Sequence, residues 1–178
     1  MVSRSLYVLL EGNDDERFFQ RLLKPSLQMT YHKVRFWKYA REKRSRTLKF
    51  IRSLGKIGAD FIFVRDIDSV PSVGLKKREI RESYDNAIPD QSIVVVVMEI
   101  EGWYMAGPDP DYLGHLGIPI REWSTDSLTK EMFNQLIPPR MSRIEFMNEL
   151  LEHYDIDRGM RRNTSFSYFV EHWMRRRS

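Results

Sequence analysis

The chain has 178 residues, no cysteine and a formal net charge of +4. This length favours one domain with a substantial buried core, and the lack of cysteine excludes disulfides, thiolate metal sites and cysteine nucleophiles. No apolar run approaches the ~20 residues of a membrane span, and the opening strand is too short for a signal peptide. We therefore expect a soluble, cytoplasmic protein that has no membrane partner.

The first half of the chain alternates between strand and helix patterns. Buried strands are predicted at 5–10, 59–64 and 93–98, and a half-exposed strand at 33–39. Helices are predicted at 14–24, 45–56 and near 75–87, where apolar residues recur at helical spacing or charged residues predominate. Four strands that alternate with helices predict an α/β fold, a Rossmann-like, doubly wound, mainly parallel sheet.

The pattern changes after Gly107, where prolines and glycines interrupt it. Helices are expected at about 126–136, 142–153 and 164–175, and Asn163 or Thr164 is placed to cap the last of them. We interpret residues 1–107 as an α/β core and residues 108–178 as a helical extension that is packed on the same domain.

Two acidic motifs follow buried strands at the points where those strands end. Glu11 comes directly after the first strand, with Asp15 and Glu16 one helical turn further on, and Asp66 and Asp68 follow the third strand. The carboxyl ends of parallel strands share one edge of the sheet, so these carboxylates are expected to converge there. Hard oxygen ligands of this kind suit Mg²⁺ or Mn²⁺, and the pattern predicts metal-dependent phosphoryl chemistry.

The acidic residues and Arg65 have distinct expected roles in metal binding and catalysis. Asp66 and Asp68 would hold the ion, and Glu11 would hold it too or activate a water molecule. Arg65 would stabilise charge on the transferring phosphate. Three further carboxylates would support a second ion or orient ligands: Asp15, Glu16 and Glu101.

Purely structural roles are open for the same residues. Glu11 could pair with a lysine of the basic helix predicted at 45–56, and Asp66 and Asp68 could cap the loop and helix that follow them. Glu101 stands at the start of a predicted helix, where a carboxylate also suits the helix dipole. The nearby Trp103 is interpreted as core packing in preference to a base-stacking platform.

Positive charge is concentrated in one segment. Ten basic residues and one acid lie between residues 32 and 56, so the rest of the chain is net acidic. Such segregation indicates a binding surface for a polyanion, with a solvated helix face as the alternative. The residues that we expect to contact nucleic acid are Lys38, Arg41, Lys43, Arg44, Arg46 and Lys49.

These motifs resemble the signature of the Toprim domain, which topoisomerases, bacterial primases, OLD-family nucleases and recombination mediators share. The resemblance rests on Leu-Leu-Glu11-Gly12 after the first strand and on Val-Arg-Asp66-Ile-Asp68 after the third. It implies a compact Rossmann-like sheet with Mg²⁺ at the strand ends, and strand cleavage or nucleotidyl transfer as the chemistry. The acidic run at 11–16 is most similar to the branch of OLD-like nucleases and their small stand-alone relatives.

A narrower resemblance involves Glu99-Ile-Glu101-Gly-Trp-Tyr-Met-Ala106 and Asn163-Thr-Ser-Phe-Ser-Tyr-Phe169. These segments are similar to motifs of a small, uncharacterised Toprim-like family of bacteria and archaea that is associated with defence. The chain contains no tyrosine-bearing DNA-gate domain and no zinc-binding primase module, which argues against a topoisomerase or a complete primase.

The sequence therefore supports one leading hypothesis and two alternatives. The leading hypothesis is a Mg²⁺-dependent nuclease or related phosphodiesterase that acts in DNA repair or defence. The first alternative is a Toprim-like module that binds nucleic acid or a partner protein without cutting. The second is a hydrolase or transferase for small nucleotides, because the same metal site would serve it. The choice between DNA and RNA, and the need for a separate ATPase subunit, are left open.

Overall fold

The computed structural model describes residues 4–119 and 124–175. They group into two compact units, Met1–Val95 and Val96–Ser178. We describe each unit by itself. No helix within the described ranges is both long and apolar enough to cross a membrane.

The first unit is built on a four-stranded sheet with the strand order β2-β1-β3-β4. Its strands are β1 (Ser5–Leu10), β2 (Lys33–Lys38), β3 (Asp60–Asp66) and β4 (Ile93–Val96). The central strand β1 pairs in parallel with both β2 and β3. The predicted doubly wound, mainly parallel α/β fold is therefore confirmed.

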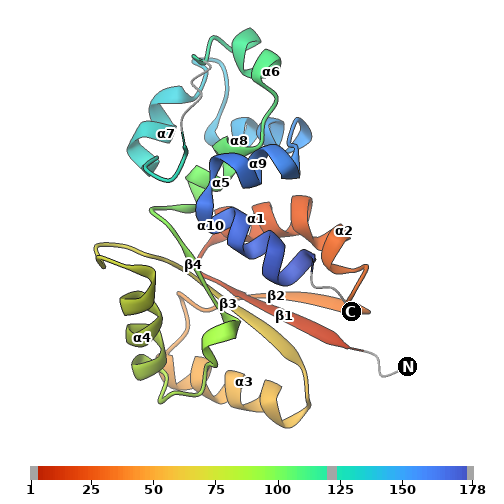
Figure 1. The fold of residues 1–178 in the computed structure, drawn as a ribbon, viewed down its shortest axis with the longest axis vertical. Coiled ribbons are helices and arrows are strands. Elements are labelled where there is room, and N and C mark those ends of the chain that lie inside the picture. The colour runs from red at the N-terminus through yellow and green to blue at the C-terminus, as the bar shows by residue number, and fades with distance from the viewer. Residues whose placement is uncertain (1–3, 120–123, 176–178) are drawn as a thin grey trace. The chain divides into compact units, whose positions relative to one another are not determined.

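Helices cover both faces of this sheet, as Figure 1 shows for the first unit. One face carries α1 (Asn13–Phe18), the π-helical segment η1 (Phe19–Leu23) and α2 (Lys24–Leu27), and the other carries α3 (Arg44–Lys56) and α4 (Val73–Ser83). A single turn of 3₁₀-helix, η2 (Asp90–Ser92), leads into β4. Burial on both faces explains the almost continuous apolar runs of β3 and β4.

The core between the sheet and the pair α3 and α4 is aromatic at its centre. Leu48, Ile51 and Leu54 of α3 are buried, and they share this core with Phe63 of β3. The ring of Tyr39 stacks on Phe63 with a centroid distance of 4.4 Å. The spacing of the three aliphatic residues is that of one helix face, which is why periodicity predicts α3 almost to the residue.

Two expectations about element ends are corrected by the backbone. The helix predicted at 14–24 is expected to end before Pro25. Pro25 instead stands at the first turn of α2, where a missing N–H costs little. The helix expected near 75–87 ends at Ser83, since Asp85 and Asn86 both adopt positive φ angles, 51° and 54°. Residues in that conformation cannot continue a right-handed helix.

The second unit consists of helices around the buried α5 (Ile100–Ala106). The others are α6 (Pro110–His115), α7 (Lys130–Leu136), α8 (Arg143–Glu152), α9 (Ile156–Arg162), α10 (Thr164–Phe169) and the π-helical segment η3 (Val170–Met174). Trp103 is fully buried in α5, with its ring centroid 5.2 Å from Phe166 and 5.6 Å from Phe169. The interpretation of Trp103 as core packing is confirmed.

Two glycines allow other segments to approach α5 closely. A Cβ at Gly102 would lie 2.8 Å from the carbonyl oxygen of Thr125, and one at Gly107 would lie 2.2 Å from the ring of Tyr154. Real Cβ atoms do not approach other atoms so closely, so only glycine fits at these two positions.

Candidate functional site

The ends of β1 and β3 bring two of the predicted site residues together. Glu11 follows Leu10, the last residue of β1, and its Oε2 atom accepts a hydrogen bond from the backbone N–H of Asp66 at 3.4 Å. Its other oxygen lies 3.6 Å from Nε of Arg65. The parallel pairing of β1 with β3 causes this meeting, because it places both carboxyl ends at the same edge.

This edge is also the point at which the strand order reverses. The chain moves from β1 to β2 on one side, and β3 and β4 are then added on the other side of β1. Loops therefore diverge between β1 and β3, and ligands of open α/β sheets bind in the crevice that such a reversal leaves. Glu11, Arg65 and Asp66 stand at this position.

Asp68 lies beyond the end of β3 and faces a different cation. Its backbone has a φ of 53°, a left-handed conformation that aspartate tolerates better than most residues. Its Oδ2 accepts a hydrogen bond of 2.5 Å from Nζ of Lys76 in α4. The Lys76 side chain is only 2% exposed, whereas that of Asp68 is 53% exposed. Lys76 thus brings a buried positive charge to the second carboxylate of the D-x-D motif.

The two acidic residues of α1 have structural contacts. Asp15 accepts a hydrogen bond of 3.0 Å from the N–H of Gly12 and so caps the start of the helix. Glu16 forms an ion pair of 2.7 Å with Lys38 at the end of β2. These contacts account for both side chains without a metal ion, and their role as ligands stays a prediction.

Glu101 belongs to the second unit, where it occupies the first turn of α5 and forms an ion pair with Arg143 of α8. Burial raises the pKa of Glu101, and the hydrogen bonds to its own backbone and to Arg143 act against that shift. The guanidinium of Arg143 also lies 5.1 Å from the ring centroid of Phe133. This contact shows how the carboxylate is held inside the helical unit; its predicted part in metal binding stays a prediction.

Within residues 4–119 and 124–175, no group of three or more His, Asp or Glu side chains is arranged as a formed metal site. The contacts above give the reason, because the cations Arg65, Lys76 and Lys38 each draw one carboxylate in their own direction. The donor set still suits a hard divalent ion, since carboxylate oxygens from neighbouring strand ends are the ligands that Mg²⁺ and Mn²⁺ prefer.

The positive charge of Arg65 interacts with Tyr39, Glu11 and Asp68 at this edge of the sheet. Burial lowers the pKa of Arg65, but the neighbouring Tyr39, Glu11 and Asp68 raise it by more, so the net shift is upward and the guanidinium stays charged. It is half-buried, with 33% of its side chain exposed. A cation in that position can attract phosphate, the role that the sequence predicts for it.

Tyr39 was missed by the sequence analysis. It follows β2, and its hydroxyl donates a hydrogen bond of 2.8 Å to the carbonyl oxygen of Val64. Burial raises the pKa of Tyr39, and the charge of Glu11 adds to this effect. Its position at the end of the predicted strand 33–39 was the available signal. Lys76 was missed as well, because nothing in a charged helix pattern indicates which lysine turns inward.

The basic residues of 38–49 divide into two groups. Arg41, Lys43, Arg46 and Lys49 line a surface hollow of about 390 Å³ at the start of α3, together with Glu42 and Ser45. Within the hollow, Arg46 pairs with Glu42 at 2.8 Å. Lys38 and Arg44 do not line it: Lys38 pairs with Glu16, and Arg44 pairs with Asp85 at 2.7 Å and also contacts the carbonyl oxygen of Ser83. The structure thus places four of the six predicted nucleic-acid contacts side by side.

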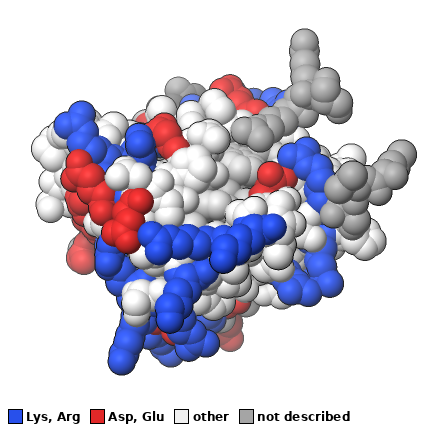
Figure 2. Space-filling view, turned by 90° about the horizontal axis from the view of Figure 1, so that it is seen from below, with Lys and Arg blue, Asp and Glu red and all other residues white. Residues whose placement is uncertain are grey.

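Figure 2 shows Lys and Arg side chains gathered over the face that carries α3 and α4, with acidic side chains in smaller groups. The first turn of α3 contains no acid, and its N-cap residue is Lys43. Positive side chains there add to the positive end of the helix dipole instead of opposing it. This arrangement gains little for helix stability and favours an anion in the hollow.

Comparison with known proteins adds little to this description. No protein-family model and no curated protein matches the chain. Among solved structures, the chain is similar to the C-terminal region of the OLD protein of Xanthomonas campestris pv. campestris, whose structure was phased with iodine. The identity is 15%, the match covers 98% of this chain and 96% of that chain, and the TM-score is 0.44. We draw no functional conclusion from so distant a similarity.

Proposed function

We propose that this chain is a divalent-metal-dependent nuclease that hydrolyses phosphodiester bonds in nucleic acid. One observation carries the proposal: Glu11 accepts a hydrogen bond from the N–H of Asp66, at the strand-order reversal of a parallel sheet. Two carboxylates and Arg65 then stand at the edge where such folds bind ligands. The resemblance of these same residues to the Toprim signature supports the proposal.

In this proposal the carboxylates would bind the metal ion or activate water, and Arg65 would stabilise the phosphate. Asp66 and Asp68 would hold a Mg²⁺ or Mn²⁺ ion with Glu11 as a third ligand, and the ion would supply Lewis-acid stabilisation of the phosphate. Arg65 would neutralise negative charge that develops on the phosphate oxygens. Glu11, if it does not bind the ion, would accept the proton of the attacking water.

The basic hollow at the start of α3 supports nucleic acid as the substrate. Arg41, Lys43, Arg46 and Lys49 would contact backbone phosphates, which positions a strand without reading its sequence. A small nucleotide carries too few phosphates to use four cations in this way. We therefore favour a polynucleotide over a mononucleotide.

A second candidate function is binding without cleavage. It is favoured by the cations that already accompany the carboxylates, Lys76 beside Asp68 and Arg65 beside Glu11. Carboxylates that are neutralised internally need no metal ion. In that case the sheet edge would be structural and the basic hollow would carry the function.

The test compares Asp66→Asn with Asp60→Asn, which changes the carboxylate at the opposite end of the same strand. Asp60 pairs with Arg4 on the surface, so this control removes an equal charge outside the site. Binding of Mn²⁺ and Mg²⁺ is measured by calorimetry, and cleavage is measured on single-stranded and duplex DNA and RNA. We expect Asp66→Asn to lose metal binding and at least roughly 100-fold in cleavage, while Asp60→Asn keeps both.

The two candidate functions predict different outcomes. A wild-type protein that binds oligonucleotides but neither binds the ions nor cuts any substrate would establish the binding module. A fully active Asp66→Asn protein would show that the chemistry lies elsewhere.

A further inference from the structure

The second unit contains a cavity that the proposed nuclease function does not use. Its volume is about 330 Å³, at the small end of the ~300–1,000 Å³ that ligand pockets occupy. Helices α5, α6, α7 and α9 and the segments 118–119 and 125–128 contribute its described lining. All of these elements belong to the unit Val96–Ser178, so the cavity is defined within one compact body.

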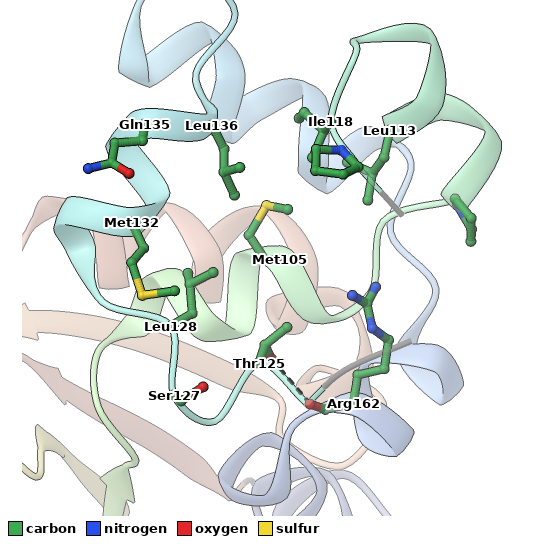
Figure 3. Close-up of a pocket in the computed structure, with 12 residues that line it drawn as sticks. Met105, Leu113, Ile118, Thr125, Ser127, Leu128, Met132, Gln135, Leu136 and Arg162 are labelled. Carbon is green, nitrogen blue, oxygen red and sulfur yellow. Dashed lines mark hydrogen bonds between the residues drawn. The ribbon is translucent and has the colours of Figure 1, made fainter. Parts of the chain in front are cut away.

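The walls of the cavity are mainly apolar. In Figure 3 the side chains of Met105, Leu113 and Leu136 point toward one another from three different helices, and Leu128 and Met132 face each other beside them. Met105, Leu113 and Leu128 are buried at 4%, 3% and 0% exposure. Apolar side chains that surround an open space favour an apolar occupant, because contact with it removes their surface from water.

One wall carries a positive charge. The guanidinium of Arg162, the last residue of α9, points toward the cavity, whereas the amide of Gln135 points away from it (Figure 3). Nη1 of Arg162 donates a hydrogen bond of 3.4 Å to the carbonyl oxygen of Ala106. Burial lowers the pKa of Arg162, and the charge of Arg158 lowers it further. A negative group at this wall would therefore meet a partly desolvated cation.

The backbone that carries Arg162 is held firmly. Its carbonyl oxygen accepts hydrogen bonds from the backbone N–H of Thr125 at 2.8 Å and from the hydroxyl of Thr125 at 3.2 Å. The next residue, Asn163, is 1% exposed and donates a hydrogen bond to the same hydroxyl at 3.1 Å. The positive wall thus belongs to a fixed part of the unit, which lowers the ordering cost of binding.

We propose that this cavity binds a small amphipathic anion, with an apolar chain or ring among the methionine and leucine side chains and a carboxylate on the guanidinium of Arg162. The charge and the apolar walls specify the two ends of one ligand, and the volume limits it to a small molecule. The proposal is independent of the nuclease function and applies to the second unit alone.

The test uses three probes of equal length that differ only in the head group: octanoate, octan-1-ol and octylammonium. Binding to the full chain is measured by calorimetry and by the shift of the melting temperature. We expect octanoate to bind and to raise the melting temperature, the alcohol to bind at least about tenfold more weakly, and the ammonium to show no binding.

Two variants and one control locate the binding. Arg162→Gln should weaken octanoate binding at least about tenfold, and Leu136→Trp should abolish it by filling the cavity. Arg161→Gln removes the neighbouring exposed charge, which does not line the cavity, and should bind as the wild type does. Melting curves confirm that each variant is folded.

The proposal is overturned if none of the probes binds, if the alcohol binds as tightly as octanoate, or if Leu136→Trp binds octanoate normally. The first result would leave the cavity without a ligand of this class, the second would remove the role of Arg162, and the third would place the binding elsewhere.

Discussion

Asp68 and Lys76 form an ion pair whose two members differ greatly in exposure. The aspartate is half-exposed, and the lysine is almost fully buried, so water can solvate one charge and not the other. An ammonium in that position depends on its carboxylate partners, Asp68 at 2.5 Å and Glu79 at 3.7 Å. Removing Asp68 should therefore change the free energy of unfolding by a different amount from removing Lys76.

We predict that Asp68→Asn destabilises the protein more than Lys76→Met. The first change leaves a buried ammonium with only the more distant Glu79, which should lower the free energy of unfolding by about 2–4 kcal/mol. The second change leaves a carboxylate that water can solvate and puts an apolar side chain into a buried position. It should alter the free energy of unfolding by about 1 kcal/mol or less.

Urea unfolding of the wild type and both variants measures this difference. Lys77→Met on the next position of α4 is the control, because Lys77 pairs with Asp90 instead. A larger loss of stability for Lys76→Met than for Asp68→Asn would contradict the argument. The result also bears on activity, since a less active Asp68→Asn protein must first be shown to be folded under the assay conditions.

At the scale of elements, sequence patterns predict those helices and strands whose apolar residues recur at a regular spacing. The apolar run of β3 and the single apolar face of α3 are periodic, and both elements appear within one or two residues of their predicted bounds. Helices α6 and α9 were not predicted, because Pro110 and Gly159 interrupt their patterns. Both residues are compatible with a helix in the structure. Pro110 stands in the first turn of α6, where proline is tolerated, and Gly159 allows α9 to pack closely against Tyr154 and Phe166.

In the candidate site, too, some features follow from the sequence pattern and others from tertiary packing. The positions of Glu11 and Asp66 follow from strand ends and parallel pairing, which the sequence pattern indicates. The partners of those carboxylates do not follow from it, because a short-range pattern does not say that Lys76 turns inward or that Tyr39 packs on Phe63. Such contacts are fixed only when the helices pack on the sheet.

The start of α10 provides a prediction at this scale. Asn163 caps the helix by accepting a hydrogen bond of 3.0 Å from the N–H of Phe166, which confirms one of the two predicted caps. Its side chain also accepts from the hydroxyl of Ser165 and donates to that of Thr125. The Ser165 hydroxyl in turn accepts a hydrogen bond from the indole of Trp103 at 2.8 Å.

We predict that Asn163→Ala lowers the free energy of unfolding by about 2–4 kcal/mol, because it removes a cap and leaves buried polar groups without their partner. Asp155→Ala is the matched control, since Asp155 caps the neighbouring α9 in an exposed position. That change should cost about 1 kcal/mol. Equal losses in thermal unfolding of the two variants would show that the buried network adds nothing to the cap.

At the scale of the whole molecule, the small net charge conceals a separation of charges. The formal net charge is only +4, yet Arg41, Lys43, Arg46 and Lys49 line one hollow. A polyanion that binds there releases counterions in proportion to the phosphates it contacts. The position of the charges, and not their sum, should therefore determine how steeply binding depends on salt.

We predict that changing these four residues to glutamine lowers the salt dependence of duplex DNA binding. The slope of log K against log salt concentration should fall in magnitude by up to about 3.6, about 0.9 for each phosphate contact that is lost. The measurement is fluorescence anisotropy with a labelled duplex at several salt concentrations, and EDTA is present so that no cleavage takes place.

The control changes four exposed cations that do not line the hollow, Lys33, Lys56, Arg140 and Arg161, to glutamine. Both variants lose four positive charges and have a formal net charge of zero, so they differ only in where the charge is lost. If the hollow binds the phosphates, the control keeps most of the wild-type slope. If both variants lose affinity and slope equally, the attraction is a property of the net charge, and the start of α3 is a solvated helix face.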